Sequence, residues 1–77
     1  MEDFVVNIDG YDMEFRASDI QDAHFVAAHK IIEKYPDLSD EVCELLDSAD
    51  MDNWTDKCDL IYELDGLDIS NISVLEE

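Results

Sequence analysis

The sequence predicts a small α+β domain in which an N-terminal β-hairpin packs against an amphipathic helix. Two observations carry this prediction. An Asp-Gly pair separates two apolar runs within the first sixteen residues, and a stretch of helical periodicity follows directly. One or two further short helices and a C-terminal strand that joins the sheet complete the expected architecture. Because 77 residues suffice for one domain only, we expect residues 1–77 to form a single acidic α+β domain.

The hairpin is expected to turn at Asp9-Gly10. A two-residue type I′ turn needs a positive φ angle at both positions, which Asp and Gly tolerate. Pairing the strands across this turn places six apolar side chains on one face, with Phe4 opposite Phe15, Val6 opposite Met13 and Ile8 opposite Tyr11. The other face carries Val5, Asn7, Asp12 and Glu14, with Asp3 opposite Arg16.

A helix is expected to begin at Ser18 and to end near Tyr35, before Pro36. Residues 18–21 have the pattern of a capping box, and Pro36 disfavours further helix. At 100° per residue, one broad apolar stripe comprises Ile20, Ala23, Ala27, Ala28, Ile31, Ile32 and Tyr35. His24 falls inside this stripe and is expected at the edge of the core, whereas His29 is expected in solvent. The helix should cover the apolar face of the hairpin, since neither can bury its face alone.

The second half of the chain predicts less regular structure. A second helix should start after Ser39, with Val42, Leu45, Leu46 and Ala49 as its narrow apolar side. The segment from Asn53 to Gly66 fits either a helix that ends at Gly66 or a hairpin that turns at Asp65-Gly66, and the helix is favoured. Residues 69–75 then give the expected last strand.

Charge excludes several classes of function. The chain has 22 acidic and 4 basic residues, for a net charge of -18. Affinity for phosphate needs a basic surface, so direct binding to DNA, RNA or an anionic membrane is excluded. About 29% of the 77 residues are Leu, Ile, Val or Phe, above the roughly 20% below which disorder is expected. No signal peptide or membrane span is predicted, which favours a cytoplasmic protein, in the host cytoplasm if a phage encodes it.

The sequence predicts no cofactor, no metal site and no enzymatic activity. Asp50, Asp52 and Asp56 do not fit a calcium-binding loop, because Thr55 stands where that loop needs Gly. The two histidines and two cysteines lack the short spacings of zinc ligands. No phosphate-binding loop or nucleophile motif is present, and two cysteines do not make a disulfide framework.

What remains is a concentration of carboxylates in the second half. Between Tyr35 and Leu60 the only basic residue is Lys57. A small domain needs a net charge of only about 2–8 in magnitude for solubility, so the excess indicates a binding role. The predicted partner-binding residues of this stretch are Asp37, Asp40, Glu41, Glu44, Asp47, Asp50, Asp52, Asp56 and Asp59. Asp12 and Glu14, on the open face of the hairpin, form a predicted secondary patch.

In size and charge, though in no motif, the whole chain resembles the nucleic-acid-mimicking inhibitors of phages and mobile elements, such as anti-CRISPR and antirestriction proteins. The resemblance implies a non-enzymatic inhibitor that occupies the basic nucleic-acid-binding surface of a nuclease or a CRISPR effector complex. Rows of carboxylates would take the place of the phosphates.

Two alternatives stay open at this point. The protein could be an acidic adaptor that binds another protein, with Trp54 as its apolar anchor. The acidity could instead reflect adaptation of a whole proteome to salt, which the excess of Asp over Glu fits. A homodimer through unpaired strand edges is also possible.

Overall fold

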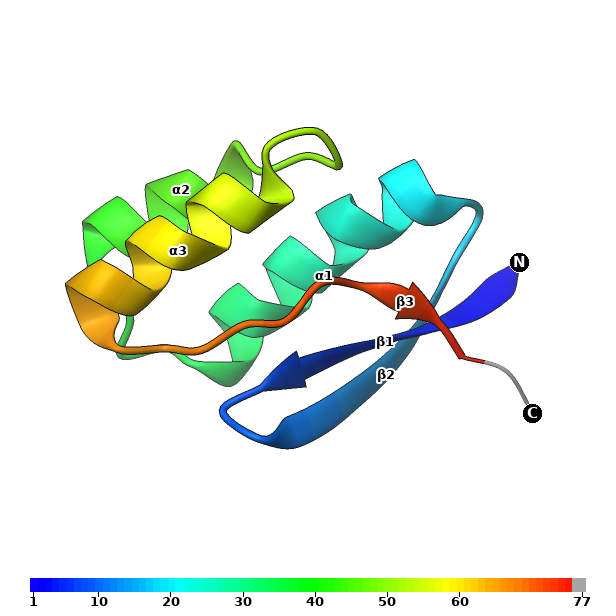
Figure 1. Ribbon diagram of the computed structural model, residues 1–77, viewed down its shortest axis with the longest axis horizontal. Coiled ribbons are helices and arrows are strands. Elements are labelled where there is room, and N and C mark those ends of the chain that lie inside the picture. Colours follow the sequence, from blue (N-terminus) through cyan, green and yellow to red (C-terminus); the bar gives the residue numbers. More distant parts are fainter. Residues whose placement is uncertain (76–77) are drawn as a thin grey trace.

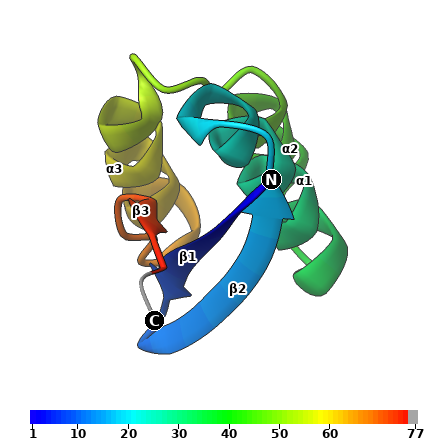
Figure 2. The ribbon, with the colours of Figure 1, turned by 90° about the vertical axis from the view of Figure 1, so that its right-hand side faces the viewer.

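A β-hairpin and three helices form two layers, as the sequence predicts (Figure 1). The computed structural model describes residues 1–75. Its elements are β1 (Glu2–Ile8), β2 (Tyr11–Ala17), α1 (Ile20–Lys34), α2 (Asp40–Asp47), α3 (Trp54–Asp65) and β3 (Ser73–Val74). The antiparallel sheet has the order β2-β1-β3. The helices lie on one side of the sheet, with α1 over the hairpin and α3 toward the β3 edge (Figure 2).

The hairpin has the predicted register. Ile8 pairs with Tyr11, and the pairing continues to Glu2 and Ala17. Asp9 and Gly10 have φ angles of 54° and 83°, as the type I′ turn requires. Tyr11 departs from the prediction, because it is 66% exposed at the turn, where the ammonium group of Lys34 lies 5.0 Å from its ring centroid.

The N-cap of the first helix lies one residue later than predicted, and the helix itself begins at Ile20. Asp19, not Ser18, is the N-cap, because its backbone is extended and its carboxylate accepts the amide N–H of Asp22 at 2.8 Å. The carboxylate of Asp22 in turn accepts the N–H and the hydroxyl of Ser18. The helix ends at Lys34 with Tyr35 as C-cap, as Pro36 predicts. Ile20, which opens the helix, is exposed rather than part of the buried stripe.

The ambiguous segment is a helix, as favoured, and Gly66 ends it. Gly66 adopts the left-handed conformation, at φ 72°, and its N–H donates to the carbonyl of Tyr62 at 2.9 Å. Asn53 occupies the N-cap position without capping the helix, because its side-chain oxygen accepts the N–H of Asp50 instead. The predicted helix after Ser39 is also confirmed, since the Ser39 hydroxyl accepts the N–H of Val42.

The last strand is shorter than the predicted residues 69–75. It consists of β3 and an isolated bridge between Ile69 and Ile8. Ser70 interrupts it, because the Ser70 carbonyl accepts the indole N–H of Trp54 at 3.1 Å. The Ser70 hydroxyl, rather than a backbone carbonyl, accepts the amide N–H of Asn7 at 2.8 Å. The Ser70 side chain thus replaces one of the two ladder hydrogen bonds to Asn7, while the Ser70 N–H still donates to the Asn7 carbonyl at 2.8 Å.

The core lies between the sheet and the helices. Its largest fully buried side chains come from all three helices and from β1, and they are Trp54, Phe4, Ile8, Ile31, Leu46, Ile61, Val6 and Val42. His24 is buried at the edge of this core, as predicted, with its Nδ1 2.7 Å from the carbonyl oxygen of Ile20. His29 is exposed, also as predicted.

Candidate protein-binding surface

The outer side of α2 presents a ridge of carboxylates. Val42 and Leu46 are buried against the core. The 100° step of the helix places Asp40, Glu44 and Asp47 on the opposite side, within about 60° of one another. All three are exposed, as is the adjacent Glu41. The same amphipathic pattern that buries one side of the helix therefore aligns these charges toward solvent.

The outer side of α3 continues the acidic surface. Trp54, Cys58 and Ile61 face the core, so Asp56 and Asp59 face outward, and both are exposed. Glu63, which is not among the predicted partner-binding residues, is exposed four residues after Asp59 on the same side. The i, i+4 spacing from Asp59 was the signal that would have identified it.

The loop between α2 and α3 carries Asp50 and Asp52, which are exposed. The Asp50 carboxylate accepts the N–H groups of Asp52 and Asn53 at 3.0 and 3.2 Å, and the Asp50 N–H donates to the Asn53 side chain. These local hydrogen bonds hold the loop in one shape, so its charges keep a defined position between the two helices.

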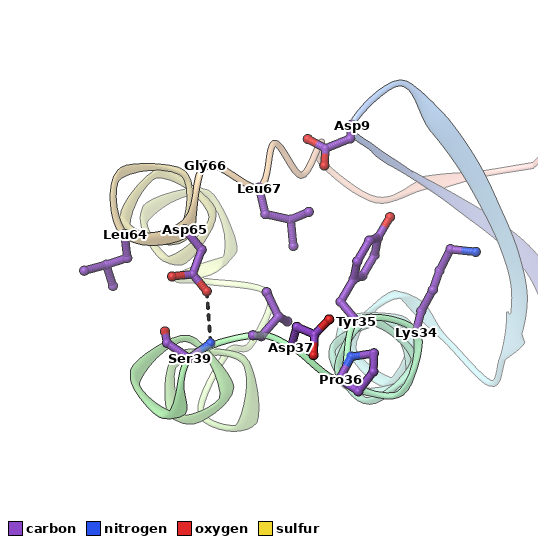
Figure 3. A pocket seen from close by; sticks show the side chains of 11 residues that line it. Asp9, Lys34, Tyr35, Pro36, Asp37, Ser39, Leu64, Asp65, Gly66 and Leu67 are labelled. Atoms are coloured by element: carbon purple, nitrogen blue, oxygen red, sulfur yellow. Dashed lines mark hydrogen bonds between the residues drawn. The ribbon is translucent and has the colours of Figure 1, made fainter.

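Asp37 lies in a groove at the end of this surface (Figure 3). The groove has a volume of about 660 Å³ and separates the C-terminal ends of α1 and α3. Two other carboxylates at the groove hold the fold: that of Asp65 accepts the N–H of Ser39, and that of Asp9 accepts the N–H of Asp68, both at 3.0 Å. Tyr35 and Leu67 extend into the groove.

Asp12 and Glu14 do not join this surface. Both lie on β2, in the sheet layer, and their side chains alternate with those of Met13 and Phe15, which face the helices. They therefore point away from the helical layer. The structure thus separates the eleven predicted carboxylates, all of them exposed, into a large helical surface and a small patch on the open sheet face.

Few partners neutralise the helical surface. Within residues 1–75 the structure has one ion pair, between Arg16 and Asp3 in the hairpin. Lys57 donates to the Ser48 hydroxyl rather than to a carboxylate. Neither α2 nor α3 has a basic residue in its last turn. The negative ends of both helix dipoles therefore add to the potential of the carboxylates.

Trp54 is not an anchor on this surface. It is 2% exposed, its ring meets His24 edge-on at 5.1 Å, and its N–H is bonded to Ser70. The adaptor hypothesis with Trp54 as the contact residue is therefore wrong, because a side chain that seals the core is not available to a partner. Met51, three residues before it in sequence, is 45% exposed.

The thiols and histidines form no reactive or metal-binding group in the part of the chain that the structure describes. There, no three His, Cys, Asp or Glu side chains are placed to hold a metal ion. Cys43 and Cys58 are both free thiols. Burial, with the nearby charges of Asp59 and Asp68, raises the pKa of Cys58 to about 12, so this thiol is not a nucleophile at neutral pH.

Comparison with known proteins adds no family. No family model matches the chain, and neither curated proteins nor solved structures gave a significant match. None of the helices within residues 1–75 combines the length and the apolar character needed to span a membrane.

Proposed function

We propose that this protein is a non-enzymatic inhibitor that binds the basic nucleic-acid-binding surface of a target protein. In this proposal the carboxylates of α2, α3 and their connecting loops take the place of nucleic acid phosphates. The target is a nuclease or a CRISPR effector complex, and the inhibitor acts in the cytoplasm, as do the phage-type inhibitors that the chain resembles in size and charge.

One observation supports this proposal above the others. Of the nine predicted carboxylates between residues 37 and 59, only Asp50 makes a side-chain hydrogen bond within the described part of the chain, and none makes an ion pair. Like charges three or four residues apart on a helix destabilise it by a few tenths of a kcal/mol each. Apart from Asp50, these carboxylates therefore do not stabilise the fold. Binding to a cationic partner would account for their accumulation on one surface.

The energetics resemble those of nucleic acid binding. When a Lys or Arg of the target pairs with a carboxylate, both groups release the salt ions that surrounded them. Binding therefore weakens as the salt concentration rises. Long-range attraction between opposite net charges also speeds association. With about six such pairs, DNA-like behaviour would lower affinity roughly 10³-fold between about 50 and 200 mM salt.

An adaptor remains the second candidate, but with a different anchor. Leu60 and Leu64 are each 44% exposed and lie one turn apart on α3, beside the acidic side of the helix. Such an apolar pair with a charged surround fits a protein interface in which burial gives most of the affinity. Substituting Leu60 and Leu64 by Ser would abolish this kind of binding and would only modestly affect mimicry.

The first test is competition. The immobilised protein is incubated with cell lysate at low salt, captured proteins are identified, and excess duplex DNA or single-stranded RNA is added. Mimicry predicts that nucleic acid releases the captured protein and that the inhibitor blocks that protein's own nucleic acid binding. Capture that nucleic acid leaves intact would contradict the proposal.

Two charge-matched variants then locate the binding surface. Asp40→Asn with Glu44→Gln removes two charges from the α2 ridge, and Asp12→Asn with Glu14→Gln removes two from the sheet. We expect the first to weaken binding at least tenfold and the second less than about threefold, if each direct charge contact contributes about 1 kcal/mol. Equal effects would show that only net charge matters.

A further inference from the structure

The outer edge of β2 is unpaired. The sheet order places β2 at one end, and no other described element hydrogen-bonds to it from outside. In a hairpin with a two-residue turn the flanking residues, here Ile8 and Tyr11, form a hydrogen-bonded pair. Alternation along the strand then directs the backbone N–H and C=O groups of Asp12, Glu14 and Arg16 away from β1. Seven residues without Gly, Pro or a bulge thus present a regular edge.

The charge at this edge differs from that of the helical surface. Three of the four basic residues lie here, Arg16 on β2 and Lys30 and Lys34 on α1. A shallow groove of about 280 Å³ runs between the two elements, lined by Met13, Glu14, Lys30, Glu33 and Lys34. The carboxylates of Asp12, Glu14 and Glu33 lie beside these cations, and Asp3 on β1 pairs with Arg16. The edge thus combines charges of both signs, unlike the acidic outer side of α3 at the opposite end of the sheet.

The edge is complementary to itself. When two β2 strands pair antiparallel about Glu14, all seven residues of each strand, 11–17, overlap. Asp12 of one copy then faces Arg16 of the other, twice, while Met13 faces Phe15 across the helix-covered side. Arg16 uses its Nε to reach Asp3, at 3.0 Å, which leaves the rest of its guanidinium group for Asp12 of the second copy.

We propose that two copies of this protein associate through their β2 edges, antiparallel about Glu14, into a dimer with a continuous six-stranded sheet. The pairing supplies hydrogen-bond partners for the outward backbone groups of β2 and covers the half-buried Met13. It keeps α3, which lies toward the opposite edge of the sheet, away from the dimer axis (Figure 2). This inference does not depend on the proposed function, since it needs no target.

The salt dependence of the dimer distinguishes the two proposals. Two copies of net charge -18 repel each other, and salt screens this repulsion. The dimer should therefore tighten as salt rises, whereas binding of a basic target should weaken. The measurement is sedimentation of the full chain from about 1 µM to 1 mM protein. It is made at about 0.1 and 1 M salt, where the Debye length falls from about 10 to 3 Å. A monomer throughout would overturn the dimer and leave target binding untouched.

Two variants test the geometry. Glu14→Pro removes an N–H that points away from β1, so it should keep the hairpin and abolish the dimer. In this pairing Glu14 of one copy faces Glu14 of the other, which is unfavourable. Glu14→Gln removes that repulsion and should tighten the dimer about two- to fivefold, while Glu63→Gln, the matched change on α3, should not. Circular dichroism checks that each variant folds. A folded Glu14→Pro protein that dimerises normally, or weaker association of Glu14→Gln, would overturn the proposed pairing.

Discussion

The acidic residues of the hairpin and α1 differ from those of α2 and α3 in what they contact. In the first region, five carboxylates accept hydrogen bonds that shape the fold. Three accept from side chains or backbone of the hairpin and the C-terminal segment: Asp3 from the Arg16 side chain, Asp9 from the Asp68 N–H and Asp12 from the Asn7 side chain. The other two lie at the start of α1, where Asp19 accepts from the Asp22 N–H and Asp22 accepts from the Ser18 N–H. In the second region, the carboxylates on the outer sides of both helices make none within the described residues. The first set stabilises the fold, and the second makes no contact that would stabilise it within the described residues.

Substitution of Trp54 tests whether this residue belongs to the core rather than to the surface, and it should change stability the most. Trp54→Ala should lower the free energy of unfolding by about 3–5 kcal/mol, because it leaves a cavity and an unpaired carbonyl at Ser70. In a domain of this size that loss approaches the total stability. Chemical denaturation measures it, and unchanged stability would show that Trp54 is not buried.

Thiol reactivity tests the same division between the buried and outer sides of the helices. At pH 8, Cys58 should be alkylated at least about tenfold more slowly than the half-buried Cys43, because its raised pKa leaves little thiolate. The raised pKa also makes the stability of the fold depend on pH. The contribution of Cys58 to the free energy of unfolding is fully present below pH 9.0, the ordinary pKa of the thiol. It is lost as pH rises toward about 12, because the thiol ionises first in the unfolded chain. Mass spectrometry after limited alkylation measures the ratio, and equal rates would contradict the assigned burial.

A pair of substitutions compares a carboxylate at the start of α1 with one on the outer side of α3. Asp19→Ala removes the N-cap of α1 and should destabilise the protein by about 1 kcal/mol. Asp59→Ala, on the outer side of α3, should change stability by less than about 0.5 kcal/mol. The midpoints of urea unfolding give both values. Similar losses at the two positions would mean that the outer carboxylates also serve the fold.

One substitution on the outer side of α2 should increase stability. Asp47 lies in the last turn of α2, where a negative charge opposes the helix dipole. Asp47→Lys should therefore stabilise the protein by about 0.3–1 kcal/mol while weakening binding of a basic target. A thermal melt measures the first part. A destabilised variant would indicate that Asp47 has a structural contact.

Much of the fold could be predicted because its determinants are local. The Asp9-Gly10 turn fixes the hairpin register, and Pro36 and Gly66 end two helices. The short β3 could not be foreseen, because Ser70 binds Trp54 and Asn7, which are distant in sequence. Exposure of the carboxylates followed from helical periodicity. The position of Asp12 and Glu14 on a separate, open face of the sheet also followed from the strand alternation around the turn.

The salt dependence of target binding shows whether the carboxylates of α2 act as substitutes for phosphates. For the captured target, the logarithm of the association constant is measured against the logarithm of salt concentration, for the wild type and for Asp40→Asn with Glu44→Gln. We predict a steep negative slope, which the variant makes shallower by about two, one for each lost charge contact. A slope near zero, or one that the variant leaves unchanged, would contradict a role for the α2 ridge as a substitute for phosphates.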